Sequence, residues 1–196
     1  MESSVAGGVT SVGPGVPVVE FDHPDRLSRL LIFVKWLLAL PHLIVIYLGG
    51  IVAAIVVVIS WFVVLITGRY PKGLWGFVVG YERYRLRVSS YLLLQTDKYP
   101  PFSFEEQADY PVRLSVEHPA RMHRWRALIS FILAIPAFLV VYIWSIAALL
   151  LTIVVWFVIL ITGRYPKGLF EFNTGALRLT TTTALYSLWT TNKYPL

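Results

Sequence analysis

Cysteine is absent from this chain of 196 residues, and charged residues make up only 14% of it. Without cysteine, the protein forms no disulfide and offers no thiolate for metal binding or nucleophilic attack. The low charged fraction is unusual for a soluble domain, in which about one residue in four is charged. Hydrophobic residues instead account for 57% of the chain. This balance indicates a membrane protein.

Recognisable catalytic patterns are also lacking. The sequence has no Ser-His-Asp order, no paired carboxylates in an apolar setting and no glycine-rich nucleotide fingerprint. Its formal net charge of +6 is not evidence for a nucleic-acid partner, because membrane proteins carry excess Lys and Arg in their cytoplasmic loops. We therefore expect no cofactor, no nucleic acid and, on balance, no enzymatic activity.

Two long apolar runs dominate the chain, at residues 30–66 and 127–161. A transmembrane helix needs about 20 apolar residues, so each run is long for one crossing and suits two short ones. We predict a helical hairpin in each run, with turns at Gly49-Gly50 and Trp144-Ser145 and with helices at 27–48, 51–67, 122–143 and 146–162. Hairpins that enter the membrane without crossing it are the alternative.

An internal repeat sets the domain organisation. The segment Gly68–Leu74 (GRYPKGL) recurs unchanged at Gly163–Leu169, 95 residues later. The same shift aligns 22–101 with 117–196 without a gap, and 33 of the 80 aligned positions are identical. The chain therefore consists of two tandem copies of one unit. The predicted boundaries are a disordered tail without signal-peptide features (1–21), repeat 1 (22–101), a linker (102–116) and repeat 2 (117–196).

The placement of charge predicts the orientation of these repeats. In the hairpin layout, every Lys and Arg lies toward the side of the repeat ends, and the two opposite turns carry none. Basic segments stay cytoplasmic, so both termini are expected there, in a multi-pass protein of the inner or plasma membrane. The predicted fold class is an all-α membrane protein whose tandem repeats are related by a pseudo-two-fold along the membrane normal.

A third element follows each hairpin, at residues 73–96 and 168–191. In the first copy, apolar side chains fall on one face of a helix, and Arg83 and Arg87 fall on the other. This pattern predicts an amphipathic helix that lies in the cytoplasmic interface. A strand is the alternative, because polarity alternates around Arg85 and the second copy is rich in threonine.

Basic side chains are the leading candidates for binding. The repeated GRYPKGL segment places an Arg and a Lys after each hairpin, where they suit lipid phosphates or another anion. The simpler interpretation is that Gly and Pro end the helix, while the cations favour its C-terminus and the headgroups. The anion-binding hypothesis includes the motif cations and the arginines of the third element, which are Arg69, Lys72, Arg83, Arg85, Arg87, Arg164, Lys167 and Arg178.

The start of each repeat suggests a second kind of site. Asp22 and His23 precede the first helix, and Glu117 and His118 precede its counterpart. If the repeats bring these four side chains together, two imidazoles and two carboxylates suit a divalent transition metal. Otherwise they cap helices and face the interface.

Lys35 and His42 are the strongly polar residues inside the first apolar run. Neither recurs in the second copy, which has Ser130 and Ala137 at these positions. An ionisable group within a membrane suggests a functional role, such as proton transfer. The alternative is that Lys35 snorkels toward the headgroups and that His42 bonds a carbonyl freed by Pro41.

The ordered motifs resemble a known family. Two apolar hairpins end in TGRYPKGL and continue into an arginine-containing amphipathic stretch, and the first copy closes with TDKYPPF. This arrangement is similar to an uncharacterised family of bacterial integral-membrane proteins that is catalogued as a domain of unknown function. The resemblance covers about residues 22–196. The second copy departs from it, with Arg178 and threonines replacing most of the arginine cluster, and the resemblance implies no reaction or catalytic residues.

Three functions are consistent with these features. The leading one is a non-enzymatic accessory or scaffold subunit, acting as a homo-oligomer or in a membrane complex, whose basic face binds anionic headgroups or a partner. The second is a channel or transporter for small solutes or ions, formed by oligomerisation around Lys35 and His42. The third is a lipid-modifying enzyme that uses the region of His23 and His118.

Overall fold

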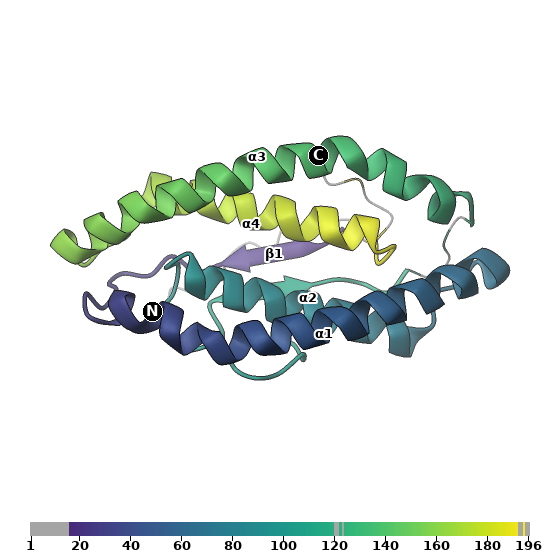
Figure 1. Cartoon of the computed structure of the whole chain (residues 1–196), viewed down its shortest axis with the longest axis horizontal. Helices are drawn as coiled ribbons and strands as arrows, with labels where there is room; N and C mark the ends of the chain where they lie inside the picture. Colours follow the sequence, from purple (N-terminus) through teal and green to yellow (C-terminus); the bar gives the residue numbers. More distant parts are fainter. Residues whose placement is uncertain (1–15, 120–121, 123, 192–193, 195–196) are drawn as a thin grey trace, which may run out of the picture.

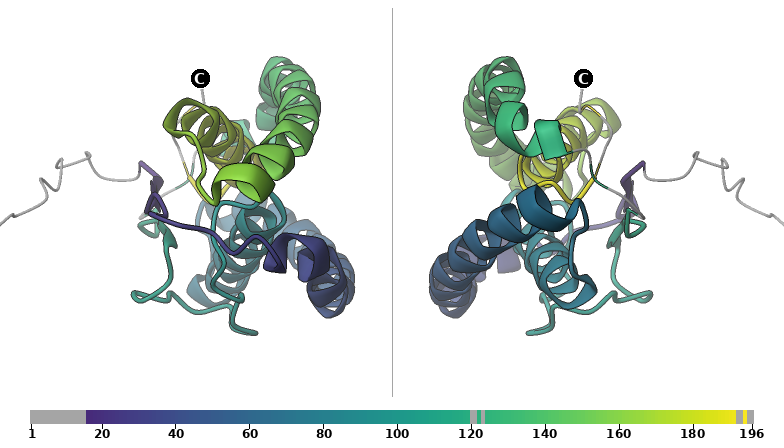
Figure 2. Two further views of the ribbon diagram at one scale, coloured as in Figure 1. Left: turned by 90° about the vertical axis from the view of Figure 1, so that its left-hand side faces the viewer. Right: turned by 90° about the vertical axis from the view of Figure 1, so that its right-hand side faces the viewer.

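The computed structural model describes residues 16–119, 122, 124–191 and 194. In this part of the chain it contains four helices and a two-stranded sheet, in the order β1 (Val18–Phe21), α1 (Leu31–Thr67), α2 (Lys72–Leu92), β2 (Val112–Ser115), α3 (Arg124–Thr162) and α4 (Lys167–Ser187). The elements form layers. Helices α1 and α3 lie on one side, α2 and α4 lie in the middle, and the sheet with its linker lies on the other side (Figures 1 and 2).

Each apolar run forms one unbroken helix rather than a hairpin. Helix α1 contains 37 residues and α3 contains 39, so the predicted turns at Gly49-Gly50 and Trp144-Ser145 are wrong. Glycine in a helix interior costs only about 1 kcal/mol relative to alanine. In apolar surroundings, a broken helix would leave backbone groups without partners, which costs more. A glycine pair is therefore a weak stop signal within a long apolar run.

Gly49 and Gly50 instead provide a flat surface for packing. A β-carbon at Gly50 would lie 2.9 Å from the hydroxyl oxygen of Tyr81, and one at Gly49 would lie 3.2 Å from the Tyr81 ring. The second repeat reverses the sizes of the partners. There Trp144 of α3 lies against Gly175 of α4, whose β-carbon would be 3.3 Å from the indole. In both repeats, a large aromatic side chain thus packs against a glycine near the middle of the paired helices.

Gly80 on α2 allows the linker to approach the helix closely. A β-carbon there would lie 2.8 Å from the carbonyl oxygen of Phe104, which is backbone and does not move aside easily. We expect Gly80→Ala to lower the free energy of unfolding by about 1–3 kcal/mol, the usual cost of overpacking. The equivalent change Gly175→Ala meets only a side chain and gains helix propensity, so it should be nearly neutral.

Thermal unfolding in detergent micelles, followed by circular dichroism, compares the two alanine variants directly. If Gly80→Ala were as stable as Gly175→Ala, the close approach of Phe104 would not constrain the fold.

Prolines inside the long helices are supported by tyrosines from the ends of the repeats. Pro41 in α1 and Pro136 in α3 disturb the carbonyl bonding of the preceding turn. The hydroxyl of Tyr99 donates to the Leu38 carbonyl at 3.4 Å, and Tyr194 donates to the equivalent Leu133 carbonyl at 3.2 Å. The repeated Lys-Tyr-Pro sequence therefore contacts the helix next to its proline.

The third element of each repeat is a helix, as expected, but it is not an exposed interfacial one. Many residues of α2 and α4 are buried, because these two helices lie between the long helices and the sheet (Figure 2). Apolar residues of α2, α4, both strands and the linker form one core: Val19, Val79, Leu86, Tyr110, Val112, Leu114, Leu177 and Leu185. The more polar helices are thus inside, and the apolar ones are outside.

The sheet falls in segments that the sequence suggested were unstructured. Strands β1 and β2 are antiparallel, with Val18 opposite Ser115 and Phe21 opposite Val112. Arg113 adds ion pairs to Glu20 at 3.1 Å and to Asp22 at 2.9 Å. The predicted tail at 1–21 and linker at 102–116 therefore each contain a strand, while residues 1–15 lie outside the described part of the chain.

The two repeats run in opposite directions along the long axis of the molecule (Figure 1). The amide of Leu27 donates to the Gly163 carbonyl at 3.0 Å, and the amide of Met122 donates to the Gly68 carbonyl at 3.0 Å. Each contact is the other shifted by 95 residues. Because α1 is one unbroken helix, its two ends are far apart. The basic segments therefore do not gather on one side of a hairpin, contrary to the prediction from the sequence.

Candidate functional site

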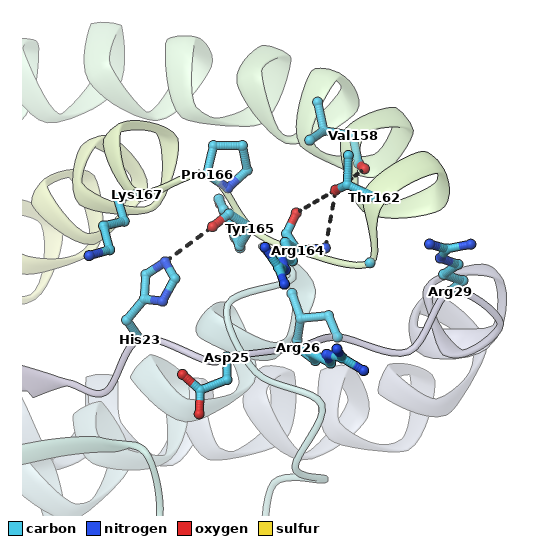
Figure 3. Close-up of a pocket in the computed structure, with 12 residues that line it drawn as sticks. His23, Asp25, Arg26, Arg29, Val158, Thr162, Arg164, Tyr165, Pro166 and Lys167 are labelled. Carbon is cyan, nitrogen blue, oxygen red and sulfur yellow. Dashed lines mark hydrogen bonds between the residues drawn. The ribbon is translucent and has the colours of Figure 1, made fainter.

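A cavity of about 890 Å³ opens where the start of repeat 1 meets the turn between α3 and α4. Its basic side chains come from both repeats, as Figure 3 shows. His23, Arg26 and Arg29 come from the segment before α1, and Arg164 and Lys167 come from the second GRYPKGL segment. The lining contains one acidic residue, Asp25, and four residues that are cationic at neutral pH, so it is basic overall.

The turn that carries Arg164 is fixed by local hydrogen bonds. Gly163 ends α3 in the left-handed conformation, with φ of +68°, and its amide bonds the Ile159 carbonyl at 2.7 Å. The Thr162 hydroxyl donates to the Val158 carbonyl at 2.7 Å and accepts from the Arg164 amide at 3.2 Å (Figure 3). Glycine suits this conformation because it has no β-carbon. The motif thus positions its arginine by capping the helix.

Contacts across the repeats hold the two walls of the cavity together. The His23 ring nitrogen Nε2 lies 3.1 Å from the Tyr165 carbonyl oxygen (Figure 3). The Tyr165 hydroxyl accepts a hydrogen bond from the Asn173 amide at 2.8 Å and points toward the Leu93 carbonyl at 3.4 Å. Burial raises the pKa of Tyr165 to about 12, so its hydroxyl stays protonated and serves as a structural donor.

The cations of this cavity have no ionic partner within the described residues. Arg26, Arg29, Arg164 and Lys167 make no side-chain hydrogen bond or salt bridge there, and all four are exposed. Several like charges close together repel one another, and an anion that binds among them removes this repulsion. The cavity can therefore hold a phosphate or a carboxylate.

The arginines of the third element serve the fold instead. Arg83 donates to the Leu114 carbonyl at 2.8 Å and pairs with Glu106 at 3.0 Å. Arg87 is buried and donates to the carbonyls of Ser103 and Glu105.

The remaining two arginines of this group are also occupied. Arg85 pairs with Glu82 at 2.7 Å. Arg178 donates to the Val19 carbonyl at 3.1 Å and lies over the Phe21 ring. The structure thus assigns Arg83, Arg85, Arg87 and Arg178 of the anion-binding hypothesis to internal contacts.

The opposite end of the molecule repeats part of the basic arrangement. His118 Nε2 lies 2.9 Å from the Tyr70 carbonyl oxygen, as His23 does with Tyr165. Arg69 and Lys72 of the first GRYPKGL segment are exposed here, and Arg124 lies close to Gly68. Among the residues described, the free cations of the two motif segments therefore lie at the two ends of the bundle.

The four residues of the metal hypothesis do not come together. His23 and His118 lie at opposite ends of the bundle, each bonded to a carbonyl that follows a long helix. Asp22 is paired with Arg113. Among the described residues, no group of three or more His, Cys, Asp or Glu side chains has a metal-binding arrangement.

Lys35 and His42 both face α2 and the loop beyond it. The Lys35 ammonium lies 2.7 Å from Asp97 and donates to the Thr96 carbonyl at 2.8 Å. His42 Nδ1 lies 2.5 Å from the Tyr84 hydroxyl, and its ring stacks on Phe102. Lys35 does not snorkel, and the Nδ1 atom of His42 bonds the Tyr84 hydroxyl rather than a backbone carbonyl near Pro41.

Comparison with known families gives one result. A family model described as Domain of unknown function (DUF4389) matches the chain twice, at residues 29–103 and 124–196. The chain belongs to the DUF4389 family. No curated protein and no solved structure matches it.

The two DUF4389 matches do not include the whole site. Arg164 and Lys167 lie within the second match, whereas His23 and Arg26 precede the first. Strands β1 and β2 also lie outside both matches. The basic cavity therefore combines residues of the second match with residues that precede the first.

Sequence reasoning found the motif cations but missed Arg26 and Arg29 as their neighbours. A signal was available, since both positions are arginine again in the second copy, as Arg121 and Arg124.

Proposed function

We propose that this protein is a non-enzymatic membrane protein, acting as a scaffold or accessory subunit, that binds anionic lipid headgroups at its basic ends. The observation that carries the proposal is the cavity lined by four exposed cations without ionic partners. Phosphate is the anion that a membrane surface supplies in abundance, and arginine binds it with directed hydrogen bonds. The positive-inside rule favours the cytoplasmic leaflet.

Exposed apolar helices support the membrane location. Two helical stretches, Leu31–Thr67 and Ile132–Thr162, are long and apolar enough to enter a membrane, and in their most apolar windows only 11% and 17% of residues are buried. The core helix of a soluble protein would be mostly buried. Large side chains such as Tyr47, Ile66 and Leu139 are more than half exposed. In water, a surface of this size would aggregate.

The crossed contacts between the repeats support a pseudo-two-fold axis perpendicular to the helices. Such an axis passes between α1 and α3 and continues toward the sheet (Figure 2). When the layer formed by α1 and α3 faces the lipid, this axis coincides with the membrane normal. Both basic ends then meet the same membrane surface.

Binding of a soluble short-chain phosphatidylglycerol to the purified protein in neutral detergent tests this proposal. We expect saturable binding, with weaker binding of short-chain phosphatidylcholine and of inorganic phosphate. Replacing two cavity cations, Arg26→Gln with Arg164→Gln, should weaken phosphatidylglycerol binding about tenfold, which corresponds to about 1.4 kcal/mol.

The control removes the same charge on the sheet side, through Lys98→Gln with Arg113→Gln. This control should bind phosphatidylglycerol nearly as the parent does, since exposed ion pairs contribute little. Equal affinity for both lipids, or equal weakening by both double variants, would contradict a headgroup site in the cavity. Tighter binding of inorganic phosphate than of the lipid would point to a soluble anion as the ligand.

The alternative functions receive no comparable support. A pore requires polar groups along a pathway, and Lys35 and His42 are engaged within the chain.

A further inference from the structure

We infer that the protein lies flat in one leaflet, with α1 and α3 running parallel to the membrane plane rather than across it. The partner of the outer face of these helices is then the acyl-chain layer of a single leaflet. The sheet and linker face the water. This inference rests on the membrane location in the proposed function, and its test does not require the cavity to bind an anion.

Helix length is the first argument. At a rise of 1.5 Å per residue, the 37 residues of α1 extend about 55 Å. The hydrocarbon core is about 30 Å thick. A straight helix of this length would have to tilt by about 57° to fit, beyond the usual range of about 0–40°. The apolar surface continues along the whole helix, from Leu30 to Ile66, so no polar segment marks where a crossing would end.

The charged middle of α2 is the second argument. The Tyr81 hydroxyl donates to the Ile46 carbonyl at 3.1 Å, which places the middle of α2 beside the middle of α1. Glu82, Arg83 and Arg85 are at the same level. In an upright orientation they would lie near the bilayer centre, where charged side chains are strongly disfavoured.

The third argument comes from the linker and the sheet. Arg83 and Arg87 hold the linker and β2 against the middle of α2. In an upright bundle, this irregular backbone and its exposed acidic side chains, including Glu105, Glu106 and Asp109, would face lipid at mid-depth. Irregular backbone does not occur there, because its polar groups have no partners. In the flat orientation, the same face meets water.

Charge at the ends of the long helices is the fourth argument. The free cations of the two motif segments lie at the two ends of the molecule. In the flat orientation, all of them reach the headgroups of the same leaflet, where they attract anionic lipids. Lys35 and His42, in the buried stripe of α1, contact α2 or the loop after it, and α1 also meets α3 through Phe33 and Trp156. The side chains of α1 that remain exposed, such as Ile44, Leu48 and Ile55, are free to contact acyl chains.

Cysteine labelling tests the orientation without background, since the chain has no cysteine. Gly73→Cys and Gly168→Cys mark equivalent positions at opposite ends, and a β-carbon at either meets no atom within 4 Å. Ala108→Cys marks the exposed linker. Leu48→Cys, with Ile44→Cys as a second probe, marks the exposed middle of α1. A membrane-impermeant maleimide is applied to right-side-out and to inside-out vesicles, with SDS-denatured samples as the total.

The flat orientation predicts that Gly73→Cys, Gly168→Cys and Ala108→Cys label from the same single side and that Leu48→Cys and Ile44→Cys label from neither. Labelling of Gly73→Cys and Gly168→Cys from opposite sides would overturn it in favour of an upright bundle. Labelling of Leu48→Cys from the side opposite to Gly73→Cys would overturn it in favour of hairpins. If the protein were missing from the membrane fraction, the proposed membrane location itself would fail.

Discussion

Replacing Asp97 with asparagine is expected to lower the free energy of unfolding by about 3 kcal/mol. The Lys35 ammonium, on a residue that is 1% exposed, lies 2.7 Å from the Asp97 carboxylate. Without this partner, the ammonium stays buried with only the Thr96 carbonyl as an acceptor. In the parent, an Asp97 carboxylate oxygen accepts a hydrogen bond from the Ser28 amide. The side-chain oxygen of asparagine can still accept this bond. Denaturation in detergent micelles, followed by circular dichroism, measures the loss.

A double-mutant cycle with Lys35→Met separates the ion pair from other effects. Lys35→Met should cost less than Asp97→Asn, because the Asp97 side chain that remains is 28% exposed. The double variant should be more stable than the sum of the single losses predicts. The second repeat supports this expectation, since Ser130 and Asn192 replace both charges at the equivalent positions. Additive losses would show that the two charges do not interact energetically.

Arg85→Thr is expected to destabilise the protein by about 3 kcal/mol at pH 8, and by much less at pH 5. Arg85 is the ionic partner of Glu82, which is buried in α2. Burial already raises the pKa of Glu82 above its ordinary value, while Arg85 counteracts this effect. Loss of Arg85 therefore raises the pKa further. The folded variant then binds more protons than the unfolded chain at intermediate pH, so its stability falls as pH rises.

Urea titrations in detergent at several pH values test this dependence. Glu82→Leu combined with Arg85→Thr reproduces Leu177 and Thr180 of the second repeat. This double variant should recover most of the stability and lose the pH dependence of the single variant. An equal loss for Arg85→Thr at pH 5 and pH 8 would show that the guanidinium acts through packing rather than charge.

The parts of the fold that depend on local chemistry were predicted well from the sequence. Gly68 and Gly163 end the long helices in the left-handed conformation, as a glycine before Arg-Tyr-Pro suggested. The third element is a helix in both copies. Turn chemistry and helical periodicity act within a few residues, so one repeat contains enough information to place these elements.

Features that depend on distant contacts were not predictable in the same way. Strands β1 and β2 are four residues each, and they pair across more than 90 positions. The packing of Tyr81 beside Gly49 and Gly50 is likewise a contact between residues more than 30 positions apart. At the cavity, the motif identified Arg164 and Lys167, but only the opposed direction of the repeats brings Arg26 to them. Sequence spacing does not reveal that direction.

The crossed backbone contacts have a consequence for how the chain arose. The Leu27 amide bonds the Gly163 carbonyl of the other repeat, and the Met122 amide bonds the Gly68 carbonyl, so the carbonyl that ends each long helix is satisfied by the other copy. In a chain with one copy, the same bonds form only between two molecules, in a self-complementary interface. The tandem protein is in this sense a homodimer joined into one polypeptide. Fusion makes its assembly independent of concentration, and it lets one half keep the pairs Lys35–Asp97 and Glu82–Arg85 while the other half replaces them.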